Sequence, residues 1–160
     1  MTDHQTHLPN CGPVAVAYAV RADIDPGRFG RVDSSYVNDV MRHMKATFNK
    51  GARWQGRSNL SQLCKMLDLY GIKHKATRRV SGYSLKRWVD METRAGRSYI
   101  VRTGGHFQFV RGSLVSDQYE TAAADDFHLG RKRVTHVIEI IERERDDSFA
   151  QELFRSMAAA

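Results

Sequence analysis

The sequence predicts one α+β domain, because helical patterns come first along the chain and strand patterns follow them. Residues 1–96 place apolar side chains mainly at helical spacing, residues 97–142 form β-branched and alternating runs, and residues 143–160 return to a helical pattern. The chain has 160 residues, of which 41% are hydrophobic, enough for one core. We find no repeat, low-complexity tract or linker that would divide it.

Four helices are expected in the first part. The first, at residues 11–21, is apolar on almost every side, so it should be buried in the middle of the domain. Pro13 lies in its first turn, where a missing N–H costs nothing. Three amphipathic helices follow, each beginning at a serine that can cap a helix N-terminus. They are expected at residues 34–48, from residue 58 to a stop at Gly71, and from residue 84 to near Gly96.

Four strands are expected after Gly96, rich in β-branched and aromatic residues. A two-residue turn at Gly112 and Ser113 joins the second strand to the third as a hairpin. The expected ranges are 98–103, 106–111, 114–117 and 134–141.

Composition limits the classes of function. The net charge of +7 favours weak binding of polyanions through solvated basic faces, but no nucleic-acid-binding motif is present. No apolar stretch is long enough to span a membrane, so no membrane partner is expected. The first residues do not resemble a signal peptide, so we expect a cytoplasmic protein. The two cysteines, Cys11 and Cys64, should be free thiols, and we expect neither a metal nor a cofactor.

Cys11 is the first candidate for chemistry. It begins the buried helix, where free backbone N–H groups and the helix dipole favour a thiolate. Gly12 has no side chain beside the sulfur and could leave room for a substrate carbonyl, which makes it a candidate substrate-binding residue. The alternative is that Cys11 is only a small apolar residue at the start of a core helix.

His106 and Asp117 are the candidate partners of this thiol. His106 follows two glycines and opens a strand, so a rigid imidazole could act as the base, with Gly105 allowing close approach of substrate. The hairpin should return Asp117 to the start of that strand, where its carboxylate could orient the ring. Asp117 could equally be an ordinary turn residue. Gln5, six residues before Cys11, could donate to an oxyanion together with the Cys11 backbone N–H.

Other residues have weaker contexts. Trp54 lies in a polar loop and could border a cleft and bind substrate, although an ordinary packed loop explains it as well. His74 lies in a charged segment and His128 in a turn-like stretch, so neither is expected to act as the base. Cys64 shares the apolar face of its helix and is expected to be inert.

The pattern Gln-x5-Cys-Gly-Pro at the start of an apolar helix, then Gly-His-Phe on a strand and a nearby Asp, resembles the papain-like cysteine peptidase superfamily. It is most similar to the compact bacterial and phage branch that includes the bacteriocin-leader-processing peptidases. The resemblance implies a helical half packed on an antiparallel sheet, with a cleft between them. It implies that Cys11 is the nucleophile, His106 the base, Asp117 the orienting residue and Gln5 the oxyanion donor.

Three departures from the family pattern are visible. The segment from Asn10 to Pro13 lacks the aromatic residue that follows the nucleophile in papain. Cys11 and His106 are 95 residues apart (106 − 11), a shorter separation than in papain, so the helical half must be trimmed. Asp117 also follows the histidine more closely than in the bacteriocin-processing group.

We therefore expect a cysteine peptidase that hydrolyses a peptide or isopeptide bond in a peptide or protein substrate. A cell-wall amidase or endopeptidase and an acyltransferase are alternatives that use the same Cys–His pair. A further alternative is a non-catalytic structural or binding protein on the same fold, for instance a phage virion component with a virion or host-protein partner. If the protein is encoded by a phage, the host cytoplasm or the virion is its expected location.

Overall fold

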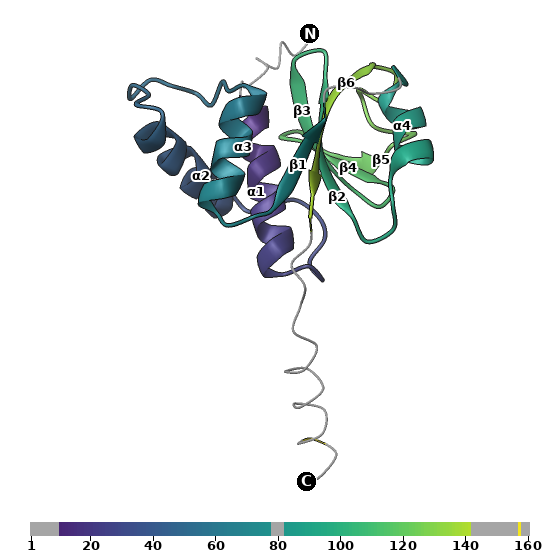
Figure 1. The fold of residues 1–160 in the computed structure, drawn as a ribbon, viewed down its shortest axis with the longest axis horizontal. Helices are drawn as coiled ribbons and strands as arrows, with labels where there is room; N and C mark the ends of the chain where they lie inside the picture. Colours follow the sequence, from purple (N-terminus) through teal and green to yellow (C-terminus); the bar gives the residue numbers. More distant parts are fainter. Residues whose placement is uncertain (1–9, 78–81, 142–156, 158–160) are drawn as a thin grey trace, which may run out of the picture.

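A computed structural model of the chain, which describes residues 10–77, 82–141 and 157, has α+β architecture with one antiparallel sheet (Figure 1). The α+β class expected from the sequence is confirmed. The helices described are α1 (Cys11–Ile24), α2 (Ser34–Thr47), α3 (Leu60–Leu69) and α4 (Leu85–Glu92). The strands described are β1 (His74–Thr77), β2 (Ser98–Thr103), β3 (His106–Arg111), β4 (Leu114–Ser116), β5 (Thr121–Ala123) and β6 (Val134–Ile140). They lie in the order β1-β6-β2-β3-β4-β5.

Helix α1 is the centre of the larger core, as its sequence predicts. All residues from Gly12 to Arg21 are buried. The helix packs between β3 on one side and α2 and α3 on the other (Figure 1). Ile100, Phe109 and Ile138 face it from the sheet. Because α1 is apolar on all sides, it lies where other parts of the protein surround it.

A second, smaller core lies on the opposite face of the sheet under α4 (Figure 1). Trp88 of α4 contacts Tyr99 of β2 edge to face, with ring centroids 5.2 Å apart. Phe127, in the segment between β5 and β6, is buried in the same cluster. The sheet is therefore covered on both faces, which explains why β2 is buried along almost its whole length.

Two short strands were not predicted. Strands β1 and β5 lie at the two edges of the sheet and have four and three residues; β1 is largely exposed and β5 is largely half-buried. Edge strands of this kind are often polar and lack the apolar alternation that identifies a strand in sequence. Since β1 joins the sheet and α4 lies on the far face, residues 1–96 are not simply a helical half. His74, expected in a charged segment, lies in β1 with its side chain only 12% exposed.

The predicted element boundaries need small corrections. Helix α1 continues to Ile24, three residues beyond the predicted end, and α3 begins at Leu60 because Asn59 forms a capping box with Gln62. The C-terminal helix expected at residues 143–160 lies outside the described residues, apart from Met157. No helix among the described residues is long and apolar enough to cross a membrane.

One turn made by two glycines sets the site end of the sheet. Gly104 and Gly105, both with positive φ, connect β2 to β3 so that Thr103 pairs with His106. Strand β4 then runs antiparallel to β3, with Ser116 opposite Phe109. The chain therefore returns towards the start of β3, and Asp117 follows directly after β4.

Candidate active site

Cys11 lies in the first turn of α1 with its side chain half-buried. Burial raises the pKa of the Cys11 thiol, but a hydrogen bond from the His106 side chain and one from the Phe107 backbone N–H lower it. The positive charge of His106 and the Gly12 backbone N–H lower it further, so the thiol pKa lies below its ordinary value. The structure thus brings together the cysteine and histidine that the sequence singled out.

His106 lies between this thiol and a carboxylate. Its Nε2 is 3.0 Å from Oδ2 of Asp117, which leaves Nδ1 to face Cys11. Burial lowers the pKa of the imidazole, but the hydrogen bonds and charges of Asp117 and Cys11 raise it to about 9. The opposite pKa shifts of Cys11 and His106 favour a thiolate–imidazolium ion pair at neutral pH.

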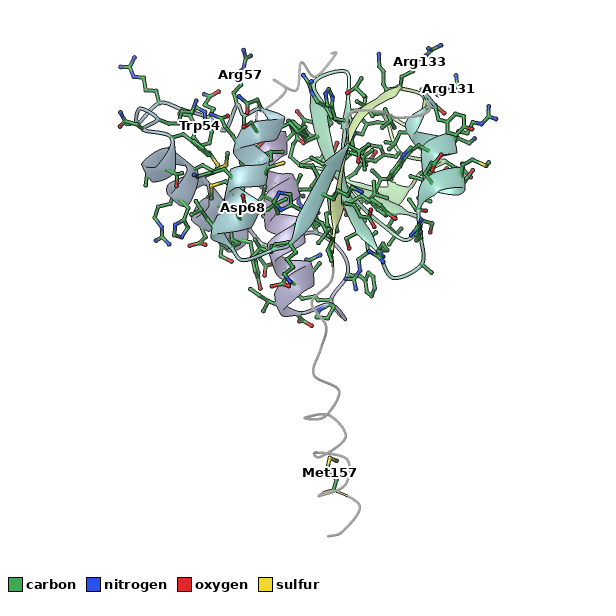
Figure 2. The ribbon with its side chains drawn as sticks, viewed as in Figure 1. Trp54, Arg57, Asp68, Arg131, Arg133 and Met157 are labelled. Carbon is green, nitrogen blue, oxygen red and sulfur yellow. The ribbon has the colours of Figure 1, made fainter. Side chains whose placement is uncertain are left out.

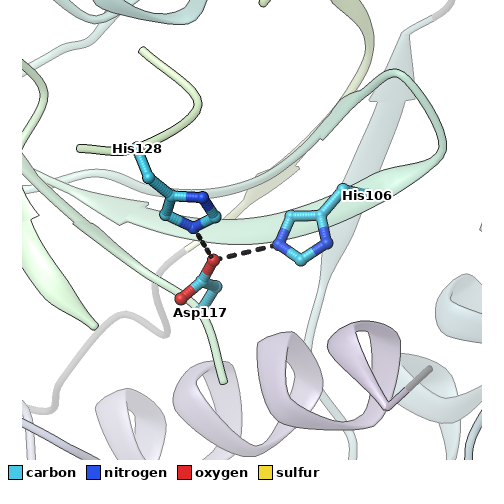
Figure 3. Close-up of side chains that lie close together, drawn as sticks. All are labelled: His106, Asp117 and His128. Carbon is cyan, nitrogen blue, oxygen red and sulfur yellow. Dashed lines mark hydrogen bonds and ion pairs between the residues drawn. The ribbon is translucent and has the colours of Figure 1, made fainter. Parts of the chain in front are cut away.

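Asp117 is the buried anchor of the site. Its side chain is 0% exposed, and its Oδ1 accepts backbone N–H groups of Tyr119 at 2.8 Å and Glu120 at 3.0 Å. Its Oδ2 accepts from His106 and also from His128, whose Nε2 is 2.5 Å away (Figure 3). Burial raises the pKa of the carboxyl group, but these four donors together lower it to about 2. Asp117 is therefore ionised at any pH where the protein would act.

His128 is the residue of this site that the sequence did not reveal. It lies between β5 and β6, and its backbone N–H donates to Oε1 of Glu120 at 2.9 Å. No periodic pattern, glycine pair or strand end marks this position in the sequence. Only the tertiary fold brings the segment over Asp117.

Gly12 has a different role from the one expected. It is buried, and a Cβ there would overlap Oγ of Ser58 and lie 3.0 Å from Cδ2 of Leu63. The space beside Gly12 is thus already filled by the residues that lead into and form α3. The expectation that Gly12 leaves room for a substrate carbonyl is wrong, because its missing side chain permits close packing instead.

Trp54 is held by its own loop. Its indole N–H donates to the carbonyl of Arg57 at 2.9 Å, and the ring packs against the core around α1. Its role in substrate binding stays a prediction, as does that of Gly105, which is exposed in the turn directly before His106. Gln5 lies outside the described residues. Arg131 and Arg133 lie near α4, on the other side of the molecule from Arg57 (Figure 2).

Among the described residues, a candidate metal site lies at the same place. One ligand atom each from His106, Asp117 and His128 lies within 4.8 Å of the others, close enough to share a metal ion. The two hydrogen bonds to Oδ2 of Asp117 account for the same spacing. The spacing therefore needs no metal ion to explain it.

A groove of about 540 Å³ opens next to the site. It lies between α1, α2 and the turn after β4, and its lining includes Asn10, Val14, Met41 and Asp117. This volume is in the range of small-molecule and peptide sites. Asp117 belongs to the lining of the groove, whereas Cys11 and His106 do not, so the groove adjoins the candidate active site at Asp117.

Comparison with known proteins does not identify a family: no family model matches the chain, and no curated protein matches it. The functional argument therefore rests on the residues and their geometry.

Proposed function

We propose that this protein is a papain-like cysteine peptidase that hydrolyses a peptide or isopeptide bond. The observation that carries the proposal is the continuous contact from Cys11 through His106 to Asp117, with pKa shifts that favour the ion pair. A buried cysteine with only a packing role would have a raised thiol pKa, as Cys64 does because of burial and the nearby charge of Asp68.

The geometry supports a two-step acyl transfer. The Cys11 thiolate attacks the carbonyl carbon, the C–S bond forms, and the carbonyl oxygen becomes an oxyanion. Backbone N–H groups in the first turn of a helix have no intrahelical partner, so the Cys11 N–H can donate to that oxygen. Gln5 is the expected second donor.

Nδ1–H of the His106 imidazolium then protonates the leaving nitrogen, and the C–N bond breaks to leave an acyl-enzyme. Neutral His106 next removes a proton from water, which attacks the acyl carbon. The C–S bond breaks, the thiolate returns and the carboxylic acid product leaves. Asp117 keeps the imidazole oriented and stabilises its positive charge through both steps.

The ion pair can be tested without a known substrate. We would measure the rate of Cys11 alkylation by iodoacetamide against pH in the wild type and in His106→Ala, using mass spectrometry to separate the two cysteines. The expected result is labelling of Cys11 that persists below pH 7 in the wild type and moves towards the free-thiol pKa of about 8.5 in the variant. Cys64 serves as an internal reference and should label slowly. Identical profiles in both proteins would contradict the proposal.

Peptide hydrolysis needs a separate experiment. The wild type would be incubated with a library of peptides from a digested proteome, and new N-termini would be identified by mass spectrometry. Cleavages present with the wild type and missing with Cys11→Ala would support a peptidase. An ion pair without any such cleavage would favour a cell-wall substrate, an acyl acceptor other than water, or a binding protein that retains the pair.

A further inference from the structure

Asp117 bonds two imidazoles through one oxygen atom, although the proposed mechanism needs only His106. Nε2 of His106 is 3.0 Å from Oδ2, and Nε2 of His128 is 2.5 Å from the same atom (Figure 3). An ionised carboxylate only accepts hydrogen bonds, so both Nε2 atoms must donate. The second donor therefore needs an explanation of its own.

The other oxygen shows what the second donor adds. Oδ1 accepts the backbone N–H groups of Tyr119 and Glu120, and these two bonds fix the position of that oxygen. They leave the carboxyl plane free to turn about Oδ1, which would move Oδ2 away from His106. His128 is a second donor on Oδ2 from outside the β4–β5 turn, and it holds the carboxyl plane independently of His106.

His128 is itself held firmly enough for this purpose. Its backbone N–H is bound to Glu120, and its ring packs at a centroid distance of 4.6 Å from Phe127, which is 4% exposed in the core under α4. The ring also meets Tyr119 edge to face at 5.9 Å. The second core thus supports the donor that reaches Asp117.

We propose that His128 is a positioning residue of the site, which fixes the Asp117 carboxylate so that His106 keeps its Nδ1 directed at Cys11. This inference rests on the proposed function. His128 also shares Oδ2 with His106, and removing it would by itself strengthen the remaining bond. The His128 side chain is 37% exposed, so water would enter its place and solvate the carboxylate. Because this water weakens the interaction of Asp117 with His106, the loss of positioning outweighs the gain from the unshared oxygen.

The test compares two amide side chains of different length at position 128. In His128→Gln the amide N–H can occupy the place of Nε2, whereas in His128→Asn the side chain is too short. His43→Gln is the matched control, because Nε2 of His43 is 3.6 Å from Oδ1 of Asp39 on α2, away from the site. The readout is the pH profile of Cys11 alkylation by iodoacetamide, which a loss of stability alone would not move. Thermal unfolding checks that each variant is folded, and His128→Ala replaces His128→Asn if the latter is not.

We expect His128→Asn to move the alkylation midpoint upward by about one pH unit, which is roughly a tenfold lower rate below the midpoint. His128→Gln and His43→Gln should keep the wild-type profile. A wild-type profile in His128→Asn, or an equal upward shift in His128→Gln, would overturn the inference and leave the proposed function intact. A wild-type midpoint near 8.5 would overturn both.

Discussion

Nε2 of His106 donates to Oδ2 of Asp117 across 3.0 Å, and this bond fixes which nitrogen of the imidazole faces the thiol. Because Asp117 is fully buried and ionised, its charge acts on His106 with little screening by water. The Asp117–His106 pair thereby sets the protonation state of the whole site, and the first three predictions depend on it.

Asp117→Asn removes the charge and keeps the shape. We expect the pKa of His106 to fall and the thiolate fraction of Cys11 to fall with it, because the imidazolium loses its buried partner. Cys11 alkylation at pH 6 should slow by at least roughly tenfold, and hydrolysis of any cleaved peptide by roughly 100-fold or more. Asp39→Asn, which alters a carboxylate near His43 on α2, is the control and should leave both rates unchanged. Equal rates in wild type and Asp117→Asn would show that the carboxylate does not act on the pair.

The rate of peptide hydrolysis should have a bell-shaped pH dependence. It rises as Cys11 loses its proton, and the lowered thiol pKa places this limb below the usual range of a cysteine. It falls as His106 loses its proton, which places the upper limb near pH 9. The two apparent pKa values belong to the coupled pair and not to either residue alone. The measurement is kcat/KM for one cleaved peptide from pH 4 to 10, and a rate that still rises at pH 10 would disprove the ion-pair assignment.

Stability should fall at acid pH through Asp117. Its folded-state pKa of about 2 lies below the unfolded value of about 3.9, so its stabilising contribution is fully present above pH 4. The contribution is lost as pH falls towards 2, and amounts to about 2–3 kcal/mol. Urea unfolding of wild type and Asp117→Asn between pH 5 and 2 measures it. The wild type should lose more stability than the variant in this window, and parallel curves would contradict the prediction.

The sequence was sufficient for the parts of the fold that have strong local signals. Helix α1 was recognised because it is apolar on all sides, and β2 and β3 were placed at their observed residues because β-branched runs flank two glycines. The His106–Asp117 contact followed from the hairpin length, whereas the pairing of Cys11 with His106 came from the resemblance to the papain-like superfamily. The helix, the two strands and the hairpin depend on short stretches of chain, so a local pattern determines them.

The parts of the fold and the site that the sequence did not predict depend on segments that are distant along the chain. Strand β1 has no apolar alternation and becomes a strand only because β6 offers an edge to pair with. His128 reaches Asp117 only because Phe127 anchors the segment between β5 and β6 in the second core. Gly12 was misjudged for the same reason, since nothing in the sequence shows that Ser58 packs against it. Long-range packing of this kind produces no characteristic residue spacing in the sequence, so a local pattern does not predict it.

Gly12→Ala tests this close packing at the start of α1. The new Cβ would overlap Oγ of Ser58, and we expect a loss of about 1–3 kcal/mol in the free energy of unfolding, because overpacking a well-filled site forces neighbours to shift. Ser58→Ala alone should cost little, since Oγ of Ser58 is buried and has no hydrogen-bond partner in the described part of the chain. The double variant should recover part of the loss, because removal of Oγ leaves the nearest atom as Cδ2 of Leu63 at 3.0 Å. A double-mutant cycle by urea unfolding measures the coupling. Additive effects of the two changes would mean that Ser58 does not limit the space at Gly12, and the role of Gly12 beside the nucleophile would then need another explanation.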